Sequence, residues 1–114
     1  MIDARKGLNM FRKVNVPLLG IIENMSHFLC TECGARHEIF GNGGARAEAA
    51  KLGVPFLGEV PLEMAIRATS DEGTPIVASQ PDSPHAAHHG AIAEAVLQTL
   101  ERNTPKASPN IIVE

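Results

Sequence analysis

Aromatic residues are scarce in this sequence, which has four Phe and neither Tyr nor Trp among its 114 residues. A packed core must therefore rely on aliphatic side chains. Basic residues are not in excess either: 10 Lys and Arg stand against 13 Asp and Glu, which argues against a nucleic-acid-binding protein. No apolar run approaches the roughly 20 residues of a membrane span, and no secretion signal is recognisable. These absences predict a cytoplasmic protein that binds neither nucleic acid nor membrane.

Cysteine is also rare. Cys30 and Cys33 are the two in the chain, and they form a Cys-x-x-Cys pair followed by Gly34. This is too few for a disulfide scaffold. The thiolates of such a turn can converge on one metal, but tetrahedral zinc or an iron–sulfur cluster takes four ligands. Either the flanking His27 and His37 complete the set, or a second chain does so across a twofold axis.

The spacing alone leaves three other interpretations open. One is a purely structural zinc knuckle. Another is a redox pair, although such pairs usually lie at a helix N-terminus, whereas Glu32 lies inside this pair and no apolar helix follows it. The third is two cysteines without a role, since the spacing can arise by accident.

Helical periodicity and turn residues predict helices and short strands in alternation. Gly53 marks the end of one helix, and Ser83 and Pro84 mark the start of another as its N-cap and first residue. The predicted helices cover residues 4–14, 45–52, 62–68 and a stretch from 84 onwards, and the predicted strands cover residues 18–22 and 56–60.

One short pattern occurs twice. Val-Pro-x-Leu-Gly stands at residues 16–20 and again at 54–58, each time between a predicted helix and a predicted strand. This arrangement is typical of consecutive helix–strand units in a parallel sheet. Ligands bind beyond the carboxyl ends of such strands, here residues 23–26 and 61–63. Two strands are too few for a stable sheet of this kind, so we expect the sheet to need strands beyond the two that this sequence predicts.

Several motifs together resemble a known family. Glu23-Asn24-Met25-Ser26 precedes the Cys-x-x-Cys-Gly motif, and the segments 39–44, 52–62 and 82–84 continue the match in the same order. The sequence from about residue 3 to 102 resembles the Mrp/ApbC group of iron–sulfur cluster carriers, which are deviant-Walker P-loop ATPases of the MinD/ParA type. The resemblance implies an α/β fold: the C-terminal part of a P-loop NTPase parallel sheet with flanking helices and a Cys-x-x-Cys turn or hairpin insertion.

The resemblance also implies functional residues. Cys30 and Cys33 correspond to the family's cluster ligands, which hold one [4Fe–4S] cluster between two chains. It therefore implies a homodimer that delivers clusters to apo iron–sulfur proteins. Four further residues correspond to positions on the adenine side of the family's nucleotide site: Asn24, Pro61, Leu62 and Glu63.

The sequence departs from the family in one major respect. It contains no Gly-Lys-Ser or Gly-Lys-Thr, and the family's acidic magnesium-binding segments are absent as well. We therefore expect no ATP hydrolysis by this chain alone, with ATP and magnesium bound only in a full-length context. Residues 1–103 are expected to form part of a larger α/β domain with an open sheet edge, and residues 104–114 a flexible tail.

One alternative function stays open. In it, the chain is a structural zinc-binding or dimerisation module of a split or truncated ATPase and transfers no cluster. Zinc is also a possible substitute for the cluster in the isolated protein, because the same thiolates bind both.

Overall fold

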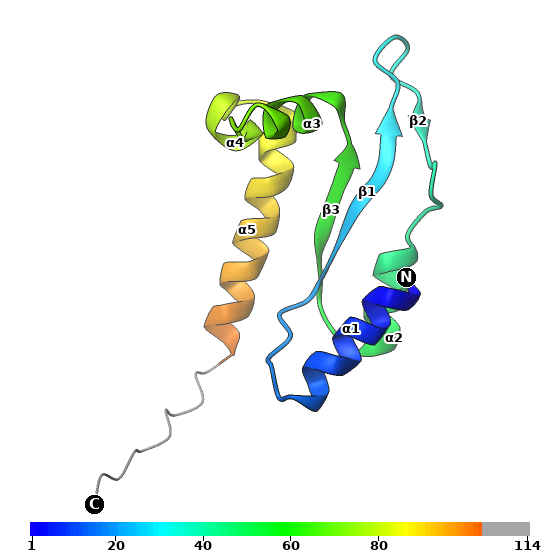
Figure 1. Cartoon of the computed structure of the whole chain (residues 1–114), viewed down its shortest axis with the longest axis vertical. Helices are drawn as coiled ribbons and strands as arrows, with labels where there is room; N and C mark the ends of the chain where they lie inside the picture. The colour runs from blue at the N-terminus through cyan, green and yellow to red at the C-terminus, as the bar shows by residue number, and fades with distance from the viewer. Residues whose placement is uncertain (104–114) are drawn as a thin grey trace, which may run out of the picture.

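A computed structural model of the chain describes residues 1–103, which contain five helices and three strands (Figure 1). In chain order these are α1 (Ile2–Lys13), β1 (Ile21–Leu29), β2 (Arg36–His37), α2 (Gly44–Leu52), β3 (Phe56–Leu62), α3 (Met64–Asp71), α4 (Ile76–Ser79) and α5 (Pro84–Arg102). The predicted tail, residues 104–114, lies outside the described part. Helices flank a small mixed sheet, which confirms the α/β class.

The three strands form one sheet in the order β2-β1-β3. β1 and β3 run parallel, with Ile21 opposite Phe56 and Phe28 opposite Leu62, whereas β2 is antiparallel to β1. Within residues 1–103, β2 pairs with β1 only at Phe28 and Leu29, so most of that edge of β1 has no strand beside it. The two Val-Pro units thus lead into neighbouring parallel strands, as predicted.

Both parallel strands are longer than the sequence predicts. The prediction ended the first strand at Ile22 and placed residues 23–26 beyond its end, whereas β1 begins at Ile21 and continues to Leu29. β3 likewise continues through residues 61–62. The reason is tertiary, because hydrogen bonds to a parallel partner hold polar residues in a strand that their own preferences do not favour.

The predicted helix ends are largely confirmed. Gly53 closes α2 in the left-handed conformation, with φ of 64°. The Ser83 hydroxyl accepts a hydrogen bond from the backbone N–H of Ala86, and Pro84 is the first residue of α5. The third predicted helix is displaced: α3 begins at Met64, because β3 occupies the residues before it.

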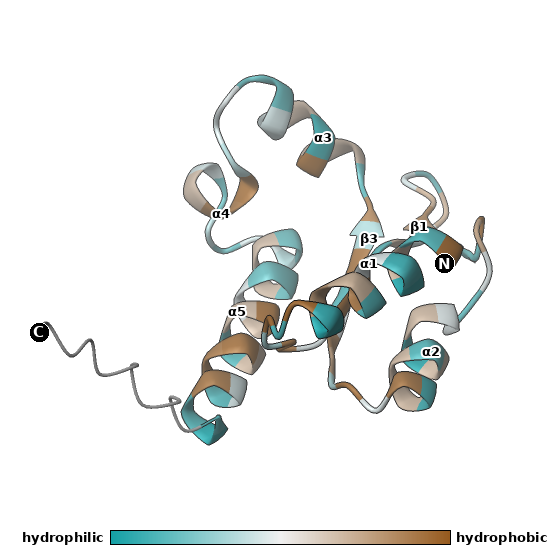
Figure 2. Cartoon of the chain, turned by 60° about the horizontal axis from the view of Figure 1, so that its bottom comes forward, coloured by the Kyte–Doolittle hydropathy of each residue, from teal (hydrophilic) through white to brown (hydrophobic). Residues whose placement is uncertain are grey.

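Helices cover the β1–β3 pair from two sides. α5 lies on one side and α2 on the other in both Figure 1 and Figure 2, and hydrophobic bands run along α5 in Figure 2. α5 approaches β3 closely at Gly58, where φ is +148° and a Cβ atom would lie 2.7 Å from Cγ1 of Ile92. Only glycine permits this contact, so Gly58 sets the distance between α5 and the sheet.

α1 is joined to α2 by side-chain contacts. The Arg5 guanidinium donates to the buried carboxylate of Glu48, and Arg12 donates to the backbone carbonyl of Leu52. Leu8 is the buried residue of α1. In the described part of the chain, no helix combines the length and apolar character needed to cross a membrane.

Candidate metal centre

The cysteine pair lies on a tight hairpin between β1 and β2, seen as the loop at the top of Figure 1. The backbone N–H of Cys30 donates to the carbonyl of Ala35 at 2.9 Å, and the N–H of Gly34 donates to the carbonyl of Cys30 at 2.8 Å. Gly34 has φ of +70°, a conformation that strongly favours glycine. The predicted turn is therefore present, and Gly34 is the residue that permits it.

Both cysteines are free thiols, with Cys30 half-buried and Cys33 exposed. The backbone N–H groups of Cys33 and Glu32, together with the Cys33 thiol, face the Cys30 sulfur and lower the pKa of the Cys30 thiol. Hydrogen bonds to a sulfur favour its charged form. The thiolate is the form of cysteine that binds metals, so the turn favours the form of Cys30 that a metal site would require.

Neither flanking histidine joins the cysteines. His27 is buried in β1, where its Nδ1 lies 3.0 Å from the Ser26 hydroxyl, and exposed His37 lies opposite Phe28 in the strand register. In residues 1–103 no three His, Cys, Asp or Glu side chains form a group that could hold a metal ion. The described chain therefore presents two thiols at this site.

The four predicted nucleotide-side residues lie on the two parallel strands and the turn after β3. Asn24 pairs with Val60, so it lies beside Pro61, which is buried. Leu62 ends β3, and Glu63 is the N-cap residue of α3 without a side-chain capping bond. The register thus places Asn24 inside β1 rather than at its end, and it is Phe28, four residues further along, that lies opposite Leu62.

The Asn24 side chain already has a local role. Its Oδ1 accepts a hydrogen bond from the backbone N–H of Met25 at 3.0 Å. Met25 adopts φ of +53°, a rare conformation for a residue with a side chain, at the irregular stretch between Asn24 and Phe28. This irregularity turns Ser26 and His27 inward, which the sequence did not predict.

A cavity of about 710 Å³ is lined by residues of α1, of the first half of β1, of the segment 40–42 and of α2. Exposed apolar side chains line it, among them Phe11, Ile22, Met25 and Phe40. This cavity could not be predicted from the sequence, because Phe11 fits the apolar stripe of an ordinary packed helix. Asn24 also lines this cavity, whereas Pro61, Leu62 and Glu63 do not.

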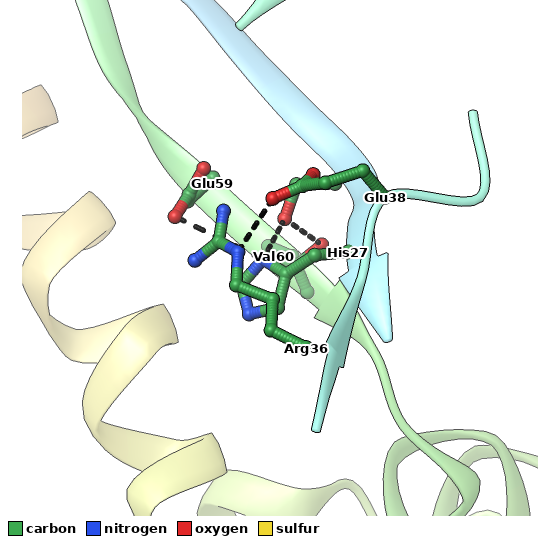
Figure 3. Close-up of polar contacts among 6 residues, drawn as sticks. His27, Arg36, Glu38, Glu59 and Val60 are labelled. Carbon is green, nitrogen blue, oxygen red and sulfur yellow. Dashed lines mark hydrogen bonds and ion pairs between the residues drawn. The ribbon is translucent and has the colours of Figure 1, made fainter. Parts of the chain in front are cut away.

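Figure 3 shows a group of polar side chains on and beside the three strands that could not be predicted from the sequence. It contains two pairs: His27 of β1 with Glu59 of β3, and Arg36 of β2 with Glu38, which follows β2. Arg36 Nε lies 2.6 Å from Glu38 Oε1, and His27 Nδ1 lies 3.9 Å from Glu59 Oε1. These residues are up to 32 positions apart in sequence, so no local pattern connects them.

Comparisons with known proteins show the family to which the chain belongs. Residues 1–97 match the ParA family model described as NUBPL iron-transfer P-loop NTPase. The iron-sulfur cluster transfer protein NUBPL of Dictyostelium discoideum is 46% identical over 99% of this chain and 36% of its own length. The iron-sulfur cluster carrier protein of Escherichia coli K12 is 46% identical over 88% of this chain and 27% of its own length.

A solved structure is also similar. It is a nucleotide-binding protein from Archaeoglobus fulgidus in complex with ADP, 35% identical, with a TM-score of 0.55 over 62% of this chain and 29% of that one. The chain thus spans about a third of the length of the curated relatives that it matches. With the family model matched over residues 1–97 and the expected fold in place, the chain belongs to the NUBPL iron-transfer group of ParA-type P-loop NTPases.

Proposed function

We propose that this chain carries an iron–sulfur cluster on Cys30 and Cys33 and passes it to apo iron–sulfur proteins. The observation that carries the proposal is the hairpin, which presents two free thiols and lowers the pKa of one of them. The names of the relatives as cluster transfer and carrier proteins support it.

The cluster that we propose is [4Fe–4S], held between two copies of the chain. Such a cluster takes four thiolates, and each chain supplies two. Apolar side chains flank the hairpin on both sides: Leu29 is 40% exposed and Ile39 is 56% exposed. A twofold contact that covered these residues would bring the two hairpins together and remove apolar surface from water.

Nucleotide binding belongs, in our proposal, to the larger protein of which residues 1–103 form part of one α/β domain. Asn24, Pro61, Leu62 and Glu63 would there contact the base of ATP, with magnesium bound by segments that this sequence lacks. The chain has no Gly-Lys-Ser or Gly-Lys-Thr, so we expect no ATP hydrolysis by it alone. Free thiols require a reducing compartment, and we propose the cytoplasm.

Anaerobic reconstitution with iron and sulfide tests the cluster. We expect about four irons and four sulfides per two chains, a species of twice the monomer mass, and transfer of the cluster to an apo-ferredoxin. Cys30→Ser and Cys33→Ser should each abolish cluster uptake, while His37→Ala, the matched control beside the hairpin, should leave it intact.

The same experiment separates the alternative. Protein purified without chelator that holds zinc, takes up no cluster and transfers none would favour a structural zinc or dimerisation module. A monomer that retains both thiols and takes up no iron would contradict the cluster proposal altogether.

A further inference from the structure

The cysteine hairpin leaves the sheet shortly after a bulge in β1. Between the paired residues Asn24–Val60 and the paired residues Phe28–Leu62, three residues of β1 lie opposite one residue of β3. Extra residues bend the strand that carries them, so the bulge sets the direction in which β1 continues toward the cysteines. Whatever fixes the bulge therefore also fixes the direction of the hairpin.

The backbone alone holds this part of the chain weakly. β2 has two residues, which pair with Phe28 and Leu29, and the N–H of Cys30 donates to the carbonyl of Ala35. So short a ladder is marginal in water. Met25, inside the bulge, has a φ of +53°, and such a conformation persists only where the surrounding structure holds it. Side chains must therefore supply part of the restraint.

Ser26 is placed to supply it. It lies in the middle of the bulge and is buried, with 5% of its surface exposed. Its hydroxyl donates to the carbonyl of Val60 on β3 at 3.2 Å. Pro61, the next residue of β3, has no N–H with which to bind β1. The Ser26 hydroxyl thus joins the two strands at the position where proline removes a backbone donor.

The same hydroxyl also holds His27, the next residue of the bulge. The Ser26 hydroxyl gives its one proton to Val60, so His27 Nδ1, 3.0 Å from the hydroxyl oxygen, must carry the proton of this second hydrogen bond. His27 is buried, and the same Nδ1 lies 3.9 Å from Glu59 Oε1 on β3 (Figure 3). Ser26 therefore donates once and accepts once, and it connects His27 to β3.

Removal of this hydroxyl has a predictable local cost. The His27 N–H and the Val60 carbonyl would each lose a hydrogen-bond partner while remaining in place. A polar group left without its partner away from water costs more than the hydrogen bond contributes when it is present. The bulge would then open more readily, and the hairpin beyond it would lose its fixed direction.

We propose that Ser26 is a positioning residue for the cysteine hairpin. By joining His27 to the carbonyl of Val60, its hydroxyl fixes the bulge and with it the direction in which the hairpin presents its two thiols. A cluster shared by two copies needs both hairpins held in the productive direction, so a loosened bulge should release the cluster faster. This last effect rests on the proposed function, whereas the position of the hairpin does not.

The test compares Ser26→Ala and Ser26→Thr with a matched control, Ser83→Ala, in the 114-residue chain. Ser83→Ala also deletes a hydroxyl that makes a hydrogen bond, but at the start of α5. Amide hydrogen exchange of the metal-free chain is measured across residues 26–38 and across residues 21–24, which precede the bulge. Urea unfolding corrects each rate for a change in global stability, and release of a reconstituted cluster to a chelator is followed by absorbance.

In Ser26→Ala we expect exchange across residues 26–38 and release of the cluster to be about two- to ten-fold faster, the range for one hydrogen bond. Exchange across residues 21–24 should match that of the wild type. Ser26→Thr keeps the hydroxyl and should restore most of the wild-type behaviour. Ser83→Ala should match the wild type once its lower global stability is taken into account.

Three results would overturn the inference: unchanged exchange across residues 26–38 in Ser26→Ala, equal acceleration across residues 21–24, or equal acceleration of the hairpin in Ser83→Ala. Ser26→Thr with the rates of Ser26→Ala would count against it as well, because the hydroxyl would then have no special role. A wild-type chain that takes up no cluster would contradict the proposed function alone, since hydrogen exchange still decides the role of Ser26.

Discussion

Gly34→Ala is the most direct test of how the hairpin prepares its two thiols. Gly34 has φ of +70°, and a Cβ atom built there would meet nothing within 4 Å. The substitution therefore creates no collision, and its whole effect is the cost of a left-handed backbone for an L-residue, about 1–2 kcal/mol. Because the hairpin is joined to the rest of the fold by the short β2 ladder, we expect this cost to open the turn locally and to leave global unfolding nearly unchanged.

The same backbone cost sets the expected loss of metal affinity. A cost of about 1–2 kcal/mol per turn weakens metal affinity about 5- to 30-fold. A site built from two chains carries the cost twice, so its affinity should fall by about the square of that factor. The assay is titration with Co²⁺, followed by the thiolate-to-metal absorption band, together with urea unfolding of the metal-free chain.

Two further variants make the result decisive. Gly34→Asn should fall between wild type and Gly34→Ala, because Asn tolerates the left-handed region better than Ala. Gly90→Ala lies in α5 with nothing within 4 Å of its Cβ, so it should stabilise the fold by about 0.5–1 kcal/mol and leave Co²⁺ affinity unchanged. Wild-type affinity in Gly34→Ala, or equal losses in Gly34→Ala and Gly34→Asn, would refute the reasoning.

Three other variants test the scaffold by urea unfolding. Gly58→Ala should lose about 1–3 kcal/mol through overpacking, because its Cβ would lie 2.7 Å from Ile92 Cγ1; wild-type stability would show that α5 can move away freely. Ser83→Ala removes the N-cap hydrogen bond of α5 and should lower the free energy of unfolding by about 1 kcal/mol. An unchanged free energy of unfolding would mean that Pro84 alone fixes the start of the helix. Hydrogen bonding to Arg5 lowers the pKa of the Glu48 carboxyl. The pair therefore stabilises the fold at any pH above the ordinary pKa of a Glu carboxyl, and this stabilisation is lost as the pH falls through the lowered pKa of Glu48. In Glu48→Gln, this contribution to the fall in the free energy of unfolding between about pH 7 and pH 3 should disappear. The same pH dependence of unfolding as in the wild type would contradict the prediction.

Local chemistry made parts of this fold predictable from the sequence. Gly53 and Ser83 mark helix ends because their backbone and side-chain preferences act within a few residues. The Cys-x-x-Cys-Gly spacing predicted the turn for the same reason, since Gly34 is needed where the turn requires positive φ. The repeated Val-Pro units indicated two strands of one parallel sheet, and these strands are β1 and β3.

Strand length could not be predicted in the same way. Residues 23–26 are mostly polar and predict the end of a strand, yet they lie inside β1 because β3 runs beside them. Met25 carries a positive φ that no residue type in that stretch suggests. The hydrogen bonds that hold such residues come from another part of the chain, so their energy is absent from any local pattern.

By itself, the sequence determined the family, the cysteine pair and the order of helices and strands, because these depend on residue identity and near neighbours. Only the tertiary structure decided which polar groups meet. His27 Nδ1 of β1 lies 3.9 Å from Glu59 Oε1 of β3, although neither residue belongs to a motif. Electrostatic contacts depend on distance in space, and the strand register alone fixes that distance.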